Sequence, residues 1–245
     1  MRFAVVTPCF NPGHYLVETL QSVIAQAGDF SLQYHVQDAI SSDGSIKLLQ
    51  SQLEQLKSGN TPLQCRELTF SYSSEPDLGM YDGINKGFRE ILQRTNVDVM
   101  LWINADDKLE FNALSQLNSY FSHHPDVEWI IGRTLHLNED SKIIFDAPPH
   151  YYRREDLARG RHNSVTLPFV TQEATVWRTC LWEHCGQLDA SLRYAGDFEY
   201  WMRAARLGYD LRSIDIPIGY HRKRLGQLSS VGCYADEVKM LLLRG

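Results

Sequence analysis

The chain has 245 residues and a formal net charge of −6, with 43% hydrophobic and 22% charged residues. A chain of this length can bury one large core, and the composition is ordinary for a globular protein. The acidic balance argues against a nucleic-acid binder, which needs a surplus of lysine and arginine. No apolar run approaches the roughly 20 residues that cross a bilayer, and the N-terminus lacks a secretory signal pattern. Five scattered cysteines favour reduced thiols. We therefore expect a cytoplasmic protein that binds no nucleic acid.

Strands and helices alternate through the first part of the chain. The predicted strands are Phe3–Thr7, Gln33–Val36, Leu68–Tyr72 and Val99–Ile103, and the predicted helices are Tyr15–Ala27, Ile46–Leu56 and Tyr81–Leu92. Apolar residues recur at helical spacing, as at Leu16, Leu20 and Val23. This alternation predicts an α/β fold with a mostly parallel, Rossmann-like sheet and helices on both faces.

The pattern becomes mixed after residue 108. The predicted strands are Val127–Ile131, Arg133–Asn138, Lys142–Phe145, Gln172–Trp177, Leu211–Ile214 and Ile218–His221, and the predicted helices are Ala113–Ser122, Gly196–Leu207 and Ala235–Leu243. The second and third of these strands would form a hairpin. The basic and polar stretch Arg153–Thr166 is expected to be a mobile loop over a site. Because no linker or repeat separates the halves, we expect one domain over residues 1–245.

The most informative stretch is a predicted buried strand that ends at two adjacent carboxylates. The apolar run Val99–Ile103 is followed by Asn104, Asp106 and Asp107. Like charges repel, and burying even one costs several kcal/mol unless a cation or hydrogen-bond donors compensate. Oxygen ligands of this kind suit Mg²⁺ or Mn²⁺ that carries a phosphate. The alternative is a solvated loop or a cap for the helix that follows.

Polar residues also follow the other predicted parallel strands. Thr7 ends the first strand and Asp38 follows the second. The carboxyl ends of parallel strands meet at one edge of a sheet, where open α/β sheets bind ligands. Asp38 could accept hydrogen bonds from a base or ribose; the alternative is a turn residue before Gly44. The chain contains neither G-x-G-x-x-G after the first strand nor a G-x-x-x-x-G-K-[ST] loop, so phosphate charge would be met by a cation and by lysine or arginine.

Seven motifs stand in order along nearly the whole chain. They are VVTPCFN (Val5–Asn11), QDAISSDGS (Gln37–Ser45), SEPDLGMYDGINKG (Ser74–Gly87), WINADD (Trp102–Asp107), QEATVWR (Gln172–Arg178), GDFEYWMR (Gly196–Arg203) and GYHRKRLGQLSS (Gly219–Ser230). In this order and spacing they resemble the family 2 glycosyltransferases of the GT-A fold, especially the bacterial branch that builds surface polysaccharides. The chain departs from the family pattern at Gly83, where relatives carry another small residue, and in the entry to Asp38.

The resemblance implies a nucleotide-binding half over residues 1–108 and an acceptor-binding half over residues 109–245. It implies that Asp106 lies near the ribose, that Asp107 coordinates a Mn²⁺ or Mg²⁺ cofactor, and that His221 contacts the metal or the diphosphate. Asp197 matches the catalytic base. The residues that would line the nucleotide pocket are Pro8, Asn11, Asp38 and Lys86, with Thr7 and Asn104 beside them.

Elementary chemistry supports a base at Asp197. Inverting sugar transfer is one displacement at the anomeric carbon, so it needs a base on the acceptor side and charge stabilisation at the leaving group. A carboxylate at a helix N-terminus is held ionised by the helix dipole, and it can take a proton from a hydroxyl within hydrogen-bond reach. The alternative for Asp197 is a simple helix cap. Trp177 and Tyr194 are candidates for stacking on an acceptor sugar, whereas Trp201 is expected in the core.

Three hypotheses follow from the sequence. The leading one is a metal-dependent inverting glycosyltransferase that moves a sugar from a nucleotide-diphosphate donor, most simply a UDP-sugar, to a lipid-linked or polysaccharide acceptor at the inner membrane face. The second is a non-catalytic nucleotide-sugar binding protein on the same fold. A nucleotidyltransferase is the third, and it lacks the glycine-rich basic loop that this chemistry needs. The segment Lys239–Arg244 suggests peripheral membrane contact, and the oligomeric state stays open.

Overall fold

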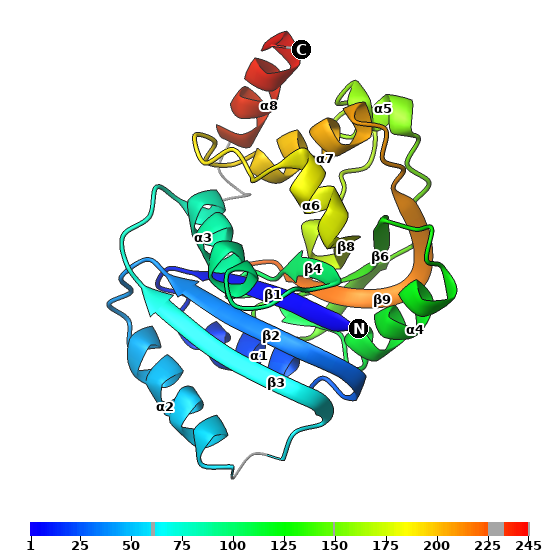
Figure 1. The fold of residues 1–245 in the computed structure, drawn as a ribbon. Coiled ribbons are helices and arrows are strands. Elements are labelled where there is room, and N and C mark those ends of the chain that lie inside the picture. The colour runs from blue at the N-terminus through cyan, green and yellow to red at the C-terminus, as the bar shows by residue number, and fades with distance from the viewer. Residues whose placement is uncertain (60–61, 149, 225–232, 245) are drawn as a thin grey trace.

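The computed structural model describes residues 1–59, 62–148, 150–224 and 233–244. Its strands are β1 (Arg2–Cys9), β2 (Gly28–Asp38), β3 (Cys65–Ser74), β4 (Val99–Trp102), β5 (Lys108–Leu109), β6 (Trp129–Leu137), β7 (Ile143–Ala147), β8 (Thr175–Arg178) and β9 (Arg212–Arg222). Within the described ranges these nine strands form one sheet in the order β3-β2-β1-β4-β8-β6-β9-β5, with β7 paired to β6 (Figure 1).

The helices are α1 (Tyr15–Ile24), α2 (Ser45–Lys57), α3 (Met80–Leu92), α4 (Ala113–His123), α5 (Arg154–Ala158), α6 (Thr179–Cys185), α7 (Gly196–Arg206) and α8 (Cys233–Arg244), with a 3₁₀ turn, η1, at Gln172–Ala174. The buried residues of α1 recur every three or four positions, as do those of α3, so each helix turns one apolar face to the sheet.

The first part of the chain forms the parallel side of the sheet. Strand β1 pairs in parallel with β2 and with β4, and β2 pairs in parallel with β3. Right-handed crossovers then require α1 and α2 on one face and α3 on the other, which is the arrangement in Figure 1. The predicted α/β fold with a mostly parallel first half is confirmed.

The second part is mixed, as predicted, although several predicted boundaries were wrong. Strand β8 is antiparallel to β4 and to β6, whereas β6 and β9 are parallel. Each of the two pairs of short strands predicted within residues 127–138 and 211–221 is one longer strand, because register shifts between β6 and β9 absorb the breaks that the sequence suggested. Helix α6 and the two-residue strand β5 were not predicted. The sheet continues across residue 108. The division at this residue into a nucleotide-binding half and an acceptor-binding half stays a prediction.

The predicted mobile loop at Arg153–Thr166 was partly wrong. Its first residues form α5, which packs against α7. Leu157 of α5 is buried, and His162 Nδ1 donates a hydrogen bond to the Pro168 carbonyl over 2.8 Å. Buried apolar contacts and internal hydrogen bonds therefore hold this segment in place.

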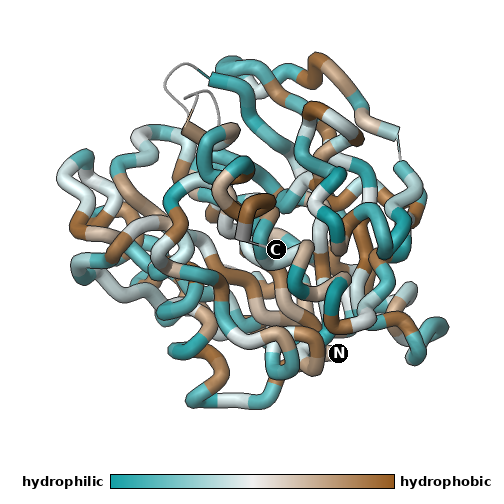
Figure 2. The backbone as a smooth tube through the Cα atoms, turned by 90° about the horizontal axis from the view of Figure 1, so that it is seen from above, coloured by the Kyte–Doolittle hydropathy of each residue, from teal (hydrophilic) through white to brown (hydrophobic). Residues whose placement is uncertain are grey.

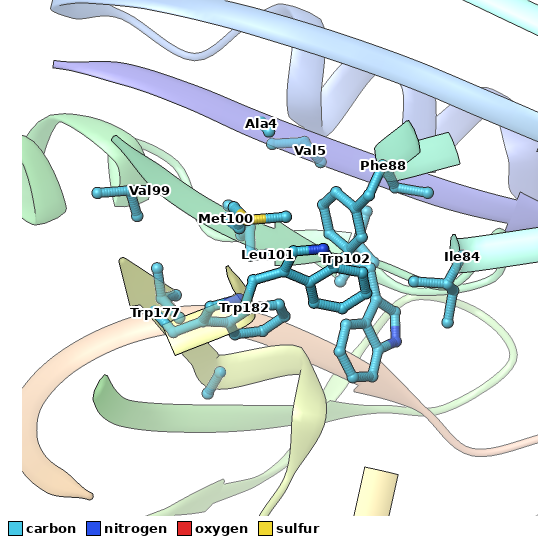
Figure 3. Packing of buried hydrophobic residues seen from close by; sticks show 14 of the residues in the cluster. Ala4, Val5, Ile84, Phe88, Val99, Met100, Leu101, Trp102, Trp177 and Trp182 are labelled. Atoms are coloured by element: carbon cyan, nitrogen blue, oxygen red, sulfur yellow. The ribbon is translucent and has the colours of Figure 1, made fainter. Parts of the chain in front are cut away.

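All five tryptophans of the chain belong to one buried cluster between the sheet and helices α3, α6 and α7. Trp102 of β4 lies 5.4 Å from Trp177 of β8 and 5.8 Å from Trp201 of α7, measured between ring centroids. Trp129 and Trp182 extend the cluster, and Phe88 of α3 lies 4.9 Å from Trp182. Figure 3 shows Trp102, Trp177 and Trp182 gathered beside Phe88. The cluster fixes α7 over the end of β4.

Hydrophobic and hydrophilic stretches alternate along the backbone (Figure 2). In the part of the chain that the structure describes, no helix combines the length and the apolar character needed to cross a membrane.

Truncation of Trp201 tests the tryptophan cluster. Because Trp201 is 2% exposed and stacks on two other tryptophans, Trp201→Ala should lower the free energy of unfolding by about 3–5 kcal/mol. Urea denaturation measures this change. Phe111→Ala is the control, since Phe111 is 69% exposed and its loss should change stability by less than about 0.5 kcal/mol. Equal effects of the two substitutions would contradict the proposed packing.

Candidate active site

The carboxyl ends of β1, β2 and β4 form one edge of the sheet. Cys9 pairs with Asp38 in the register of β1 and β2, and the chain beyond β4 stays beside β1 because the Ile103 amide donates to the Val6 carbonyl over 3.0 Å. Asp38 and the Asn104–Asp107 turn therefore share this edge, as predicted, with β1 between them.

Asp38 is fully buried at the end of β2. Its Oδ2 accepts hydrogen bonds from the Ser41 amide at 3.0 Å and from the Ser74 hydroxyl at 2.7 Å. Its Oδ1 accepts none from the described residues. Burial, and then the nearby charge of Asp38, raise the pKa of the Cys9 thiol far above its usual range. Asp38 thus shapes the loop as a turn residue while one of its oxygens stays unsatisfied.

The turn that carries Asp106 and Asp107 is clamped by the end of β9. Arg222 donates from its backbone amide to Asp107 Oδ1 over 2.7 Å and from its Nε to the Asp106 carbonyl over 2.8 Å. Arg224 donates to Asp106 Oδ2 over 2.6 Å. Asn104 donates to Asp107 Oδ2 over 3.1 Å. The two arginines supply the donors and positive charge that a buried acidic turn needs.

Asp107 lies in a cluster with His221 of β9 and Glu173 of η1. One ligand atom of each residue lies within 4.8 Å of the other two. His221 Nδ1 is 3.1 Å from Glu173 Oε1 and 3.9 Å from Asp107 Oδ1. The pairing of η1 with β9 depends on Gly219, where an added Cβ would lie 2.1 Å from the Glu173 carbonyl oxygen. Two carboxylates and an imidazole are a donor set that suits Mn²⁺ or Mg²⁺.

Charge in this cluster is balanced by His221. Burial, followed by the like charges of Asp106 and Glu173, raises the pKa of Asp107 well above its ordinary value. Burial alone would lower the pKa of His221, but Glu173 and the two aspartates outweigh it and raise that pKa to about 9. Burial likewise opposes ionisation of Glu173, yet the charge and hydrogen bond of His221 hold its pKa below the usual range. Asp107 is therefore the carboxyl of the cluster that most resists ionisation, and a cation beside it would favour its charged form.

Asp197 is the second residue of α7 and lies close to this cluster. Its Oδ1 accepts hydrogen bonds from the Phe198 amide at 2.8 Å and from the Tyr81 hydroxyl at 3.2 Å. Burial is the main reason why the pKa of Asp197 rises to about 7, and the charge of Glu173 adds to the rise. Since the charge of Glu173 also raises the pKa of Asp107, Glu173 links the cation cluster to the predicted base.

Lys86 is held by carboxylates near the start of α3. Its Nζ lies 3.3 Å from Glu75 and 3.4 Å from Asp82, and it donates to the Pro76 carbonyl over 2.6 Å. Burial would lower the pKa of Lys86, but these partners raise it overall. The lysine therefore stays charged beside the edge of the sheet.

The other predicted nucleotide residues belong to the first loop and strand. Thr7 is fully buried, and its hydroxyl lies 3.1 Å from that of Tyr34. Pro8 is buried at the end of β1. Exposed Asn11 accepts a hydrogen bond from the Ser42 amide at 2.8 Å and ties the first loop to the second. The roles given to these residues stay predictions.

The stacking role considered for Trp177 was wrong, because Trp177 is 0% exposed inside the tryptophan cluster. Sequence reasoning also missed Glu173, Arg222 and Arg224. All three lie within motifs that the sequence displays, but nothing in the residue pattern indicates that η1 and β9 reach the Asp106–Asp107 turn.

The chain is similar to known proteins in sequence and in fold. Residues 1–218 match the family described as glycosyltransferase like family 2. A 1–349 fragment of S. aureus TarS, crystallised with UDP-GlcNAc, is similar in structure with a TM-score of 0.68 and 16% identity over 99% of this chain and 65% of that one. The mannosyltransferase PcManGT from Pyrobaculum calidifontis, in complex with GDP-Man and Mn²⁺, has a TM-score of 0.62 and 17% identity over 92% of this chain and 58% of that one. No curated protein matches the sequence.

This chain therefore spans about two thirds or less of the length of those two structures. Both are GT-A glycosyltransferases, so the likeness at this level of identity establishes the GT-A fold predicted from the sequence. The family match covers most of the chain and extends from β1 into β9. The chain belongs to glycosyltransferase family 2.

Proposed function

We propose that the chain is a metal-dependent, inverting glycosyltransferase that uses a UDP-sugar. The observation that carries this proposal is the buried cluster of Asp107, Glu173 and His221 beside a carboxylate, Asp197, whose pKa rises to about 7. The cluster suits a cation with a diphosphate, and Asp197 suits the proton transfer that accompanies attack by an acceptor hydroxyl.

The cation would be held by Asp107, His221 and Glu173. The fit rests on the close approach of their donor atoms and on the burial and like charges that oppose ionisation of Asp107 unless a cation is bound. A bound Mn²⁺ or Mg²⁺ would offset the charge of the leaving diphosphate. Arg222 and Arg224, with Lys86, would add positive charge around the same edge, while Asp106 and Asn104 would border the ribose side.

Uridine is the nucleoside that Asp38 fits best. Oδ2 of Asp38 is already taken by Ser41 and Ser74, whereas Oδ1 accepts no hydrogen bond from the described residues. Uracil presents one imide N–H, which one free acceptor satisfies, but guanine presents two adjacent donors. Pro8 and Asn11 would border the base, with Thr7 behind them in the sheet.

Asp197 would act as the general base. A carboxylate with a pKa near 7 is largely available as base at neutral pH and is a stronger base than an ordinary aspartate. In a single displacement it takes the proton from the acceptor hydroxyl as that oxygen bonds to the anomeric carbon. The bond from that carbon to the diphosphate breaks in the same step, so the anomeric configuration inverts.

The acceptor that we propose is a lipid-linked or polysaccharide glycan at the cytoplasmic face of a membrane. Helix α8 supports peripheral contact, because Leu243 is 81% exposed and Leu242 is 39% exposed at its end. Two leucines provide weak membrane affinity, which suits a reversible contact with a lipid-linked substrate.

Removal of Asp107 tests the cation site. In wild type, Mn²⁺ should strengthen UDP binding in isothermal titration, and Asp107→Ala should reduce this gain by at least about tenfold, because the buried cluster loses a ligand. Asp29→Ala is the control, since the Asp29 side chain is 86% exposed and lies near the start of β2, at the opposite end of that strand from Asp38. An unchanged Mn²⁺ effect in Asp107→Ala would remove Asp107 from the cation site.

Substitution of Asp197 separates an enzyme from a binding protein. Asp197→Asn should retain UDP affinity while turnover of a panel of UDP-sugars and GDP-Man falls about 100- to 10,000-fold. The control is Asp210→Asn, which removes a carboxylate that is 78% exposed. Near-normal turnover would exclude Asp197 as the base. UDP binding without any turnover by wild type would instead favour the non-catalytic binding protein.

The pH dependence of wild-type turnover tests the same carboxylate. Only ionised Asp197 can accept a proton, so turnover should rise with pH through about 7, the pKa that burial gives this group. The rate should be measured at saturating donor and Mn²⁺ over roughly two pH units on either side of neutrality. A rate that stays flat over this range, as for an ordinary carboxylate that ionises below it, would contradict a buried base.

A charge at the end of α8 tests membrane contact. Leu243→Glu should lower flotation with anionic liposomes by about tenfold, because it replaces an exposed apolar side chain by an anion. Leu63→Glu, at a loop residue that is 50% exposed, is the matched control. Equal flotation of wild type and both variants would end the proposal of contact through α8.

A further inference from the structure

Tyr81, in the SEPDLGMYDGINKG motif, joins the first half of the chain to the predicted base. It lies in the first turn of α3 and is 1% exposed. Its hydroxyl lies 3.0 Å from the Tyr194 carbonyl and 3.2 Å from Asp197 Oδ1, so it donates toward both oxygens. The ring packs on the start of α7, because an added Cβ at Gly196 would lie 2.7 Å from it. Tyr81 therefore contacts both the backbone before Asp197 and its carboxylate.

Glu237 of α8 holds the same segment from another side. Its Oε1 accepts a hydrogen bond from the Arg193 amide at 2.8 Å. Its Oε2 accepts from the amides of Tyr194 and Ala195 at 2.7 and 2.8 Å. One carboxylate thus satisfies three consecutive backbone donors immediately before α7. Charge-assisted bonds of this kind are stronger than those between neutral groups.

The groups that face Asp197 come from four elements. Tyr81 of α3 and the Phe198 amide of α7 donate to its carboxylate, and both lower its pKa. Glu173 of η1 raises that pKa, and the charge of Asp197 in turn raises the pKa of Tyr234 in α8. Glu237 bonds the backbone before Asp197. Tyr81 is thus the side chain whose hydroxyl stabilises the ionised form of Asp197.

We propose that Tyr81 and Glu237 are positioning residues for Asp197, Tyr81 through its hydroxyl on the carboxylate and Glu237 through the backbone of residues 193–195. This inference rests on the proposed function, in which Asp197 is the base. It gives α8, which lies beyond the residues of the family match, a direct part in the geometry of the acceptor side. A base displaced by a fraction of an ångström loses catalysis without losing the donor.

Kinetics of Tyr81→Phe and Glu237→Gln test the inference. We expect each variant to lower kcat by about 10- to 100-fold with an unchanged donor KM, because the base is misplaced while the nucleotide residues are untouched. In Tyr81→Phe the rise of kcat should also move to higher pH, since the ionised form of Asp197 loses a hydrogen bond. In Glu237→Gln, an NH₂ group replaces one of the two acceptor oxygens and faces a backbone N–H. A single side-chain oxygen then remains to accept from the three backbone amides.

Matched controls separate positioning from general destabilisation. Tyr152→Phe removes a buried hydroxyl that donates to the Phe169 carbonyl, and Asp236→Asn neutralises the exposed neighbour of Glu237 on α8. Both controls should retain kcat and its pH profile. Turnover is measured with the donor that wild type hydrolyses fastest in the panel above, and circular dichroism checks the fold. If only one of the two variants folds, the kinetics of that variant decide the question alone.

Each outcome has a defined meaning. A fall in kcat at unchanged KM in either folded variant, beyond that of its control, supports the inference. Control-like kcat in the folded variants, or failure of both variants to fold, overturns it and leaves Tyr81 and Glu237 with a structural role only. If those variants are normal while Asp197→Asn is inactive, only this inference fails. If wild type turns over no donor, or if Asp197→Asn stays active, the proposed function is wrong, and the inference that rests on it is wrong as well.

Discussion

Burial of like charges at one edge of a sheet is the constraint on which the rest of the structure depends. Asp107 is 1% exposed and lies beside Asp106 and Glu173, and this burial raises its pKa. Such a group survives only when cations and donors surround it. Strand β9 and the residues just after it supply them, with His221 on Glu173 and two arginines on the acidic turn. The fold therefore has to bring β9 back to the end of β4, and the mixed second half of the sheet does this.

The hydrophobic core places the acceptor side relative to that edge. Five tryptophans join β4, β6, β8, α6 and α7, so the strand that leads into the acidic turn and the helix that begins at Asp197 share one rigid contact. Glu173 lies between the two sites and affects the pKa of both. Family membership, the GT-A fold and this arrangement together support sugar-transfer chemistry. The identities of the donor, the cation and the acceptor are proposals.

Prediction from the sequence succeeded where local pattern and chain direction suffice. The period of apolar residues gave α1 and α3, and the alternation of elements gave a parallel sheet whose strand ends bring Asp38 and Asp107 to one edge. It failed where long-range packing decides the outcome. Nothing local in Gln172–Ala174 indicates a 3₁₀ turn that brings Glu173 to His221. The sequence did not reveal that Trp177 cannot stack on a sugar, because its burial depends on residues far along the chain, such as Trp102, which lies 75 positions away.

The most direct test of the central claim is a crystal structure of the chain soaked with UDP and MnCl₂, with diffraction recorded at the manganese absorption edge. We expect one strong anomalous peak bound by Asp107 and His221, with Glu173 beside it and the uracil next to Asp38. A peak at another place, or UDP bound at the sheet edge without manganese while His221 still contacts Glu173, would contradict this expectation.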